Sequence, residues 1–541
     1  MLAMTFTWAL SAIGFLFGAS VGRLQATCGI LLALFLLLRQ HRGARARWLS
    51  LSCLIAVLAA CLFISAVTVD ITYDGWAYHQ PGVIALSHGW NPVTEPVFGT
   101  WWARYSRSIG YPSNGPLIDD LSTTVYPKAL WILGAQAVVW GLPLDSGKYP
   151  ALLLIFVVGL TTLRALRLRG IPNSWAYPLS LVTALNPVCV VQSTTFYVDG
   201  SLGSCLAILI FSLLSYDVTR SGRDLVVALC AALLACNLKF TGPVYMALIL
   251  LPFAAWWLFE RRLVARDLLI CGITASVLVA ASINPYFTNL RNFGSPVYPL
   301  NERDVMEDQM SAGFLKENTL KKLLISLTFS NLADRPSDNL AADERNFTSP
   351  FQSRGFEEFK KFGGTADLRI GGFGPFFGIT IALALLAASL LIRGPRSGIG
   401  FLLIALGTLL SVVVNPQMWW ARYVPQLWLL PVLVATAASR SRITKALALI
   451  IVLLMGITSL IAVIGRATSS YVVTLAYKDN LKRIGNAPLL VDTSVSELNF
   501  LLTLTYRLHE QGTTFEVAMG QCATPIDLLA IQGCKNDSRG R

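Results

Sequence analysis

The sequence predicts an all-α polytopic membrane protein with about 13 transmembrane helices, long outer loops and a small α/β unit near its C-terminal end. Apolar residues make up 54% of the 541 residues, whereas charged residues make up only 13%. Soluble proteins carry about 25% charged residues. The apolar residues also come in long blocks that short charged loops separate. Together these features exclude a soluble enzyme and the collagen-like, disordered and disulfide-scaffold classes.

The formal net charge is +13, which in a soluble chain would suggest a nucleic-acid partner. Here much of the basic excess lies in short loops between apolar blocks, for example at residues 39–47 and 261–266. Basic loops of this kind anchor a membrane protein on the cytoplasmic side. We therefore expect membrane lipids as partners and no nucleic acid.

The first apolar block, residues 2–21, has no Lys or Arg before Arg23, so it lacks the charged start of a cleavable signal peptide. We expect it to be a retained first span. The further predicted spans cover residues 24–38, 49–69, 149–166, 174–192, 200–216, 225–238, 243–259, 268–283, 373–392, 399–414, 424–438 and 446–464.

The apolar stretch at residues 126–142 is short for a span and carries Lys128 and Gln136. Counting it as a span would place the basic segment 164–169 outside, against the positive-inside rule. We therefore expect an amphipathic helix in the outer interface. The chain would then be a multi-pass protein of a bacterial-type inner membrane, with a cytoplasmic N-terminus and an extracytoplasmic C-terminus.

Three units follow from this topology. Residues 1–48 form a helical hairpin with a basic cytoplasmic loop, residues 49–464 form the main membrane domain, and residues 465–541 form an outer tail. The long outer loops are 70–148 and 285–372, so the working surface is expected to face outward. In the tail, residues 488–492 and 514–518 read as strands, and a helix opens at the capping box of Ser494 and Glu497.

Eight of the ten cysteines lie inside apolar blocks, where a thiol packs as a small apolar group. Cys522 and Cys534 lie close together in the polar tail. This placement favours a disulfide on an extracytoplasmic face, with two unrelated free thiols as the alternative.

The first outer loop opens with residues 70–81, DITYDGWAYHQP, directly after a predicted span. A carboxylate beside aromatic residues at a membrane surface is partly desolvated and suited to take a proton from a hydroxyl. Asp74 is therefore a candidate general base. The structural alternative is that Asp70 and Asp74 are ordinary interfacial helix caps.

The early acid Asp74 with Tyr78, His79 and Pro81 resembles the GT-C superfamily of integral-membrane glycosyltransferases, which use polyprenyl-phosphate sugars. Other segments resemble that superfamily in the same order, from about residue 49 to residue 440. They are 126–128 (YPK), 192–200 (QSTTFYVDG), 237–242 (NLKFTG), 284–300, 367–375 (DLRIGGFGP) and 415–425 (NPQMWWARYVP).

The resemblance implies a transfer of sugar from a polyprenyl-phosphate-linked donor to a glycan, lipid or protein acceptor. Asp74 would deprotonate the acceptor hydroxyl, and one displacement would invert the anomeric carbon. The leaving phosphate needs fixed positive charge. Arg422 is the first candidate, followed by Lys239 and Arg291. A basic residue that snorkels to the interface is the alternative for each.

Asp199 stands alone in a short outer loop and could orient the sugar or bind a cation with Asp74, or it could cap a helix. Asp70, Tyr78 and His79 are further candidates for substrate binding or as partners of Asp74. His79 could also be a metal ligand or a hydrogen-bonded interfacial residue. Asp119 and Asp120 read as solvated loop residues. No cofactor is required by the sequence, and a divalent cation is left open.

Two other functions compete with this hypothesis. A transporter or flippase of lipid-linked sugars would place charge at the centres of the spans, where this sequence has almost none. An O-antigen ligase or polymerase would share the lipid-linked substrate but would use mainly outer Arg and His residues. The acids at the outer ends of the spans favour the glycosyltransferase.

Overall fold

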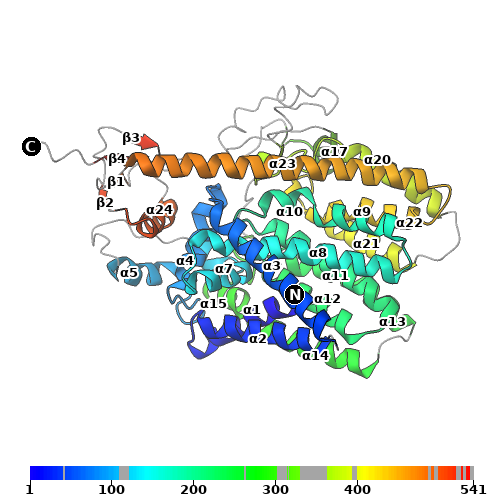
Figure 1. Cartoon of the computed structure of the whole chain (residues 1–541), viewed down its shortest axis with the longest axis horizontal. Helices are drawn as coiled ribbons and strands as arrows, with labels where there is room; N and C mark the ends of the chain where they lie inside the picture. Colours follow the sequence, from blue (N-terminus) through cyan, green and yellow to red (C-terminus); the bar gives the residue numbers. More distant parts are fainter. Residues whose placement is uncertain are drawn as a thin grey trace, which may run out of the picture.

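The computed structural model describes most of the chain, and helices dominate it (Figure 1). The described residues are 1–40, 43–108, 121–260, 264–300, 314, 316–328, 362–392, 399–484, 489–492, 498–513, 515–518, 525–527 and 532–535. Within them, five helices are long and apolar enough to cross a membrane, and a sixth span arises if one bent pair is counted. The chain is therefore a membrane protein by the length and composition of its helices.

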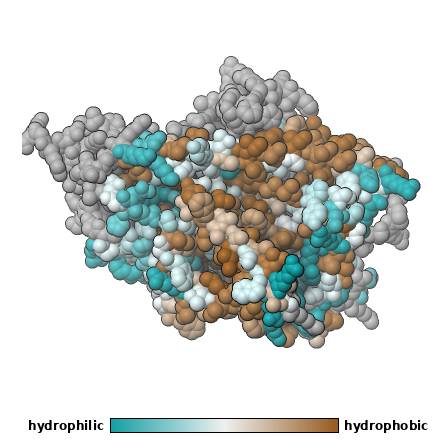
Figure 2. Space-filling view, viewed as in Figure 1, coloured by the Kyte–Doolittle hydropathy of each residue, from teal (hydrophilic) through white to brown (hydrophobic). Residues whose placement is uncertain are grey.

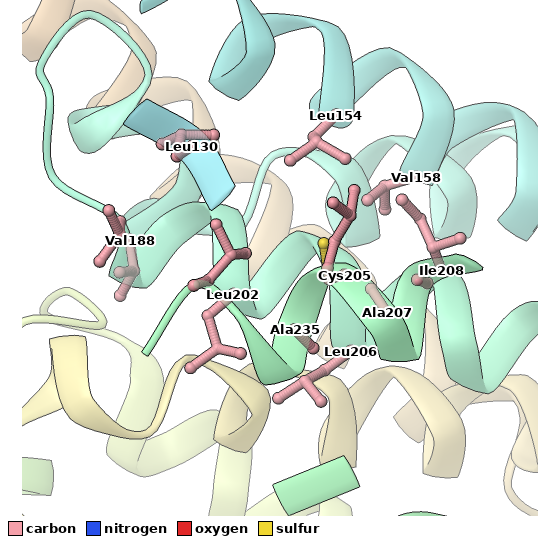
Figure 3. Close-up of a cluster of buried hydrophobic side chains, with 14 of the residues drawn as sticks. Leu130, Leu154, Val158, Val188, Leu202, Cys205, Leu206, Ala207, Ile208 and Ala235 are labelled. Carbon is pink, nitrogen blue, oxygen red and sulfur yellow. The ribbon is translucent and has the colours of Figure 1, made fainter. Parts of the chain in front are cut away.

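The centre of the molecule is α11 (Asp199–Thr219). Of the most apolar 18-residue stretch of this helix, 83% is buried. It packs against α8 (Tyr149–Leu168) and α12 (Gly222–Cys236). Figure 3 shows Leu154 and Val158 of α8 facing Cys205 of α11. A helix that is apolar on all sides is typical of the centre of a membrane bundle.

The other helices surround this centre. They are α1 (Leu2–Gly14), η1 (Phe15–Phe17), α2 (Arg23–Gln40), α3 (Ala44–Val67), α9 (Asn173–Ala184), α10 (Pro187–Gln192), α13 (Gly242–Phe259), α14 (Ala265–Ala281), α20 (Phe377–Ile392), α21 (Ile399–Val413), α22 (Leu429–Ala438) and α23 (Lys445–Ile484). The shorter elements are η2 (Gly75–His79), α4 (Gln80–Ser87), α5 (Phe98–Ser108), α6 (Leu121–Val125), α7 (Ala129–Val139), η3 (Leu144–Lys148), η4 (Ile283–Phe287), α15 (Thr288–Phe293) and α17 (Thr319–Thr328).

Polar residues gather at the two ends of the molecule, and an apolar region lies between them (Figure 2). At one end, basic side chains join consecutive turns: Arg164 pairs with Asp224 at 3.0 Å, and the Arg266 guanidinium donates to the carbonyl of Arg220 at 2.8 Å. The start of α8 lies at the opposite end, about 30 Å away for a helix of 20 residues. The turns that carry Arg164, Arg220 and Arg266 thus share one end of the bundle.

The helix at residues 126–142 was expected in the outer membrane interface, but its surroundings in the structure are different. The observed helix α7 has 11 residues, too few to cross a bilayer. However, all its residues from Ala129 to Val138 are buried, because α1, α4 and η3 pack around it. It is therefore enclosed in protein and has no apolar face left for lipid.

Two boundaries also differ from the predicted ones. The expected span 174–192 is divided into α9 and α10, because Asn186 caps a new helix that opens with Pro187. The expected boundary between residues 464 and 465 falls inside α23, which runs through 40 residues. The tail is thus joined to the bundle by a continuous helix.

Beyond α23 the structure describes α24 (Leu498–Glu510) and four short strands. The strands are β1 (Leu489–Asp492), β2 (Phe515–Ala518), β3 (Pro525–Asp527) and β4 (Gln532–Lys535), in the order β2-β1-β4-β3. β1 pairs with β2 in parallel and with β4 in antiparallel orientation. The capping box at 494–497 and the proposed Cys522–Cys534 bridge lie outside the described side chains.

Candidate functional site

A buried ion pair between Asp74 and Arg422 forms the centre of the site. Asp74 directly precedes η2, and Arg422 lies in η8 (Ala421–Tyr423), between α21 and the short helix η9 (Pro425–Trp428). Nη1 of Arg422 lies 2.7 Å from Oδ2 of Asp74. The side chains are 4% and 10% exposed, so the pair is largely shielded from water.

Asp367 holds Arg422 from a second side. Its Oδ1 lies 3.0 Å from Nε of Arg422, and its Oδ2 lies 2.7 Å from Nη2 of Arg369. The backbone fixes this arrangement, because the N–H of Arg422 donates to the carbonyl of Leu368 at 3.1 Å. Gly372 permits this close approach: a Cβ there would lie 2.6 Å from Cβ of Ala421.

Asp199 and Lys239 form a second ion pair beside the first. Asp199 opens α11, and Lys239 lies in the turn between α12 and α13. Gln192 orients this carboxylate, since its amide nitrogen lies 3.4 Å from Oδ2 of Asp199 while its amide oxygen accepts from the N–H of Gly200 at 2.7 Å. Oδ2 of Asp199 is 3.9 Å from Nη1 of Arg422, so the two pairs form one cluster.

Aromatic rings enclose the cations of this cluster. The guanidinium of Arg422 lies 4.9 Å from the ring centre of Tyr197 and 5.2 Å from that of Tyr423. Nζ of Lys239 lies 4.0 Å from the ring centre of Tyr423. Such rings keep water away from the ion pairs and favour positive charge above their faces.

Three carboxylates, Asp74, Asp199 and Asp367, thus meet three cations, Arg422, Lys239 and Arg369, and the cluster is formally neutral. Burial alone would lower the pKa of Arg422, but the carboxylates of Asp367 and Asp74 raise that pKa well above its usual value. Burial also lowers the pKa of Lys239, and the Asp199 carboxylate opposes this shift.

A divalent cation does not fit this donor set as it stands. No group of three or more His, Cys, Asp or Glu side chains that could hold a metal occurs in the described ranges. The reason is geometric: the guanidinium of Arg422 lies between the carboxylates and supplies the positive charge that a metal would bring.

His79 lies beside the cluster as a buried neutral residue. Nε1 of Trp131 donates to its Nδ1 at 2.8 Å, and the ring centre of Tyr78 lies 4.2 Å from its own. Burial lowers the pKa of His79 from 6.5 to about 3. Since Nδ1 accepts a hydrogen bond, His79 helps to pack the aromatic rings around the site and presents no Nδ1 lone pair to a ligand.

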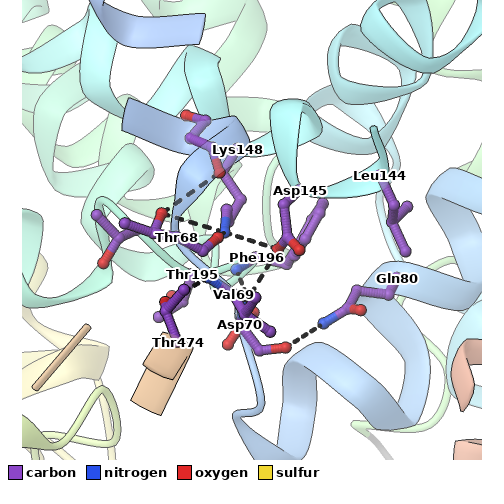
Figure 4. Close-up of polar contacts among 12 residues, drawn as sticks. Thr68, Val69, Asp70, Gln80, Leu144, Asp145, Lys148, Thr195, Phe196 and Thr474 are labelled. Carbon is purple, nitrogen blue, oxygen red and sulfur yellow. Dashed lines mark hydrogen bonds and ion pairs between the residues drawn. The ribbon is translucent and has the colours of Figure 1, made fainter. Parts of the chain in front are cut away.

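Asp70 belongs to a different cluster, shown in Figure 4. Its carboxylate accepts from the N–H of Phe196 at 2.8 Å and from the N–H of Thr72 at 2.9 Å. Its own N–H lies 3.2 Å from Oδ1 of Asp145, which pairs with Lys148 at 2.7 Å. Asp70 therefore fixes the backbone after the end of α3, and its carboxylate lies against Gly75, the residue that follows Asp74.

Arg466 of α23 is a buried cation that the sequence analysis missed. Its Nε donates to Oγ1 of Thr194 at 2.5 Å, and its other nitrogens lie 3.4 Å from the Thr194 carbonyl and 3.5 Å from that of Gly364. Among the described residues no carboxylate pairs with it. Thr194 is two residues from Gln192 in the chain, and Asp70 is the carboxylate whose charge acts on Arg466.

The structure thus brings together four of the residues that the sequence singled out, namely Asp74, Asp199, Lys239 and Arg422. Arg291 differs: it is exposed on α15, and no ion pair of Arg291 occurs in the part of the chain that the structure describes. Asp119 and Asp120 lie outside the described residues. Asp367 was missed, although its motif, DLRIGGFGP, already carried an acid and a base two residues apart.

Comparisons with protein-family models, with curated proteins and with solved structures found no match for this chain.

Proposed function

We propose that this protein is a membrane glycosyltransferase of the GT-C type, which moves a sugar from a polyprenyl-phosphate-linked donor to an acceptor hydroxyl. One observation supports this most: five segments that resemble the superfamily meet in one cluster. They supply Asp74, Gln192 with Asp199, Lys239, Asp367 and Arg422 respectively. Buried charges that distant segments of the chain bring together at one end of an apolar bundle are frequent at functional sites.

In the proposed reaction Asp74 is the general base. Arg422 holds Oδ2 of Asp74, whereas no donor in the described ranges binds its Oδ1. This oxygen would take the proton from the acceptor hydroxyl as the hydroxyl oxygen attacks the anomeric carbon. The bond from that carbon to the phosphate oxygen breaks, the phosphate leaves with the electron pair, and the configuration inverts.

The leaving phosphate would be stabilised by cations next to Asp74. Arg422 and Lys239 were the first candidates, but each already pairs with carboxylates. Arg466 contacts only neutral oxygens, and an anion would offset the cost of its burial. We therefore add Arg466 to Arg422 and Lys239 as a phosphate-binding candidate and place Arg291 last.

The proposal includes the membrane topology of the sequence analysis: about 13 spans, a cytoplasmic N-terminus and an outer active site in a bacterial-type inner membrane. The basic turns lie at one end of the bundle and the Asp74 cluster is built from segments at the opposite ends of the same helices, which supports this orientation.

The test uses the purified full-length chain in lipid vesicles and a panel of polyprenyl-phosphate sugars labelled in the lipid. The measured product is free polyprenyl phosphate, which every donor of this class releases. We expect Asp74→Asn to lower this release by about 10²- to 10⁴-fold, as the loss of a general base does. Asp479→Asn is the matched control, because Asp479 is an exposed acid with a 62% exposed side chain.

Two outcomes would contradict the proposal. One is that the parent protein releases no polyprenyl phosphate from any donor and any acceptor class. The other is that Asp74→Asn retains the parent rate while still folded. Transport of intact donor across the vesicle membrane without release would instead support the flippase alternative.

A further inference from the structure

The turn after Asp74 has an unusual backbone hydrogen-bond pattern. Residues of η2 form a π-helical turn, in which the N–H of Gln80 donates to the carbonyl of Gly75, five residues earlier. In an α-helix this N–H would instead serve the carbonyl of Trp76. The next residue, Pro81, has no N–H. The Trp76 carbonyl therefore loses both of the local donors that could reach it.

A residue of the tail supplies the missing donor. Oγ1 of Thr503, on α24, donates to the carbonyl of Trp76 at 3.1 Å, although 427 residues separate the two. Both residues are buried. A buried carbonyl without a donor is costly, so this single hydrogen bond stabilises the π-helical form of the turn.

Other contacts of α24 converge on the same turn. The ring of Phe500 lies 5.3 Å from that of Tyr73 and 6.3 Å from that of Trp76. The guanidinium of Arg507 donates to the amide oxygen of Gln80 at 2.8 Å and 3.0 Å. It also pairs with Asp145 at 2.6 Å, which ties α24 to η3. The helix thus contacts residues on both sides of Asp74.

We propose that α24 is a positioning element of the candidate site, and that Thr503 holds the Asp74 turn in its π-helical form. The carbonyl that Pro81 leaves without a backbone donor is the reason why this helix is needed. The proposal depends on the proposed function only for the consequence in catalysis, since the positioning itself is a property of the backbone.

The test measures hydrogen exchange of residues 75–80 in the full-length protein in detergent. In Thr503→Val the hydroxyl is replaced by a methyl group of the same shape, and we expect exchange of these amides to become on the order of tenfold faster. Thr505→Val is the matched control, because Oγ1 of Thr505 donates only to carbonyls of α24 itself, at 2.8 Å and 3.2 Å. It should leave exchange at 75–80 unchanged.

A rescue variant separates positioning from simple destabilisation. Pro81→Ala restores an N–H five residues after Trp76, where a π-helical turn uses it. We therefore expect Thr503→Val to have little effect on exchange in the Pro81→Ala background. Equal exchange at 75–80 in Thr503→Val and the parent would overturn the proposal, and so would equal acceleration by Thr505→Val.

Donor turnover gives a second readout. If the turn presents Asp74, Thr503→Val should lower release of polyprenyl phosphate about tenfold, and Pro81→Ala should restore it. Exchange effects as expected, with an Asp74→Asn variant that keeps full activity, would leave the positioning intact and reject the proposed function. If exchange in Thr503→Val equals that of the parent and Asp74→Asn is inactive, the positioning role is rejected and the proposed function stands.

Discussion

Arg422 and Asp74 lie 348 residues apart in the chain, and the guanidinium of Arg422 donates to the Asp74 carboxylate at 2.7 Å inside the helical bundle. The same guanidinium lies 3.0 Å from Asp367. Arg422 thus joins the first outer loop to the segment that precedes α20. Arg422 thus pairs with two carboxylates, whereas Asp74 pairs only with Arg422 among the described residues.

This inequality predicts different costs of substitution. Arg422→Gln leaves the buried carboxylate of Asp74 without its cation and leaves Asp367 with Arg369 alone, and we expect it to lower the free energy of unfolding by about 3–5 kcal/mol. Asp74→Asn leaves Arg422 paired with Asp367, and should cost clearly less. Reversible unfolding in detergent micelles measures both. Arg104→Gln is the control, since its pair with Glu95 is exposed and should contribute at most about 1 kcal/mol.

A larger effect of Asp74→Asn than of Arg422→Gln would show that Arg422 is not the residue that holds the cluster together.

Much of this cluster could be predicted from the sequence, because Asp74, Asp199, Lys239 and Arg422 each stand alone at an end of an apolar block. A charge in such a place has few structural explanations. What the sequence could not show is which charge pairs with which. The pairing of Arg422 with Asp367 depends on a close approach at Gly372, which only the folded backbone shows.

Helix breaks and tail contacts were harder to predict. Asn186 and Pro187 form a recognisable helix start, so the sequence contains the signal that divides the expected span 174–192 into two helices. In contrast, Thr503 reads in the sequence as one polar residue of an amphipathic helix. Its partner is a backbone carbonyl, and no side-chain pattern signals a carbonyl that lacks a donor.

The phosphate-binding candidates can be separated by a binding measurement. Arg466 contacts neutral oxygens, so Arg466→Gln should weaken the binding of undecaprenyl phosphate by about 10- to 100-fold, the loss expected for hydrogen bonds to a charged group. The detergent-solubilised protein is titrated with undecaprenyl phosphate, and the rise of its melting temperature with lipid concentration measures this change in binding. Arg291→Gln should leave binding unaltered because Arg291 is exposed on α15. If binding weakens in Arg291→Gln and stays unchanged in Arg466→Gln, Arg291 and not Arg466 holds the phosphate.

His79 predicts a pH dependence of stability. Burial lowers its pKa to about 3 in the folded protein, against 6.5 when unfolded, so the unfolded state binds one more proton between these values. The contribution of neutral His79 is complete above pH 6.5 and is lost as the pH falls towards 3. Between pH 6.5 and pH 5 we expect a loss of about 1.6 kcal/mol.

His79→Gln removes this titration and retains an acceptor for Trp131, so its free energy of unfolding should fall less steeply with acid than that of the parent. His509→Gln is the control, because His509 is exposed. Parallel curves for the parent and His79→Gln between pH 6.5 and pH 5 would show that His79 is not held neutral.

The last prediction concerns the contact between α23 and the segment that carries Asp367. Gly465 and Gly363 touch through their backbones: a Cβ on Gly465 would lie 2.6 Å from Cα of Gly363. Gly465→Ala must push the two segments apart, and overpacking of this kind costs about 1–3 kcal/mol. Gly456→Ala, on the same helix, would meet only Cγ1 of Val182 at 3.9 Å. It should instead stabilise the helix by up to about 1 kcal/mol. Unfolding in detergent compares the two variants, and shifts of the same sign and size would mean that the approach of Gly465 to Gly363 does not hold Asp367 in place beside Arg422.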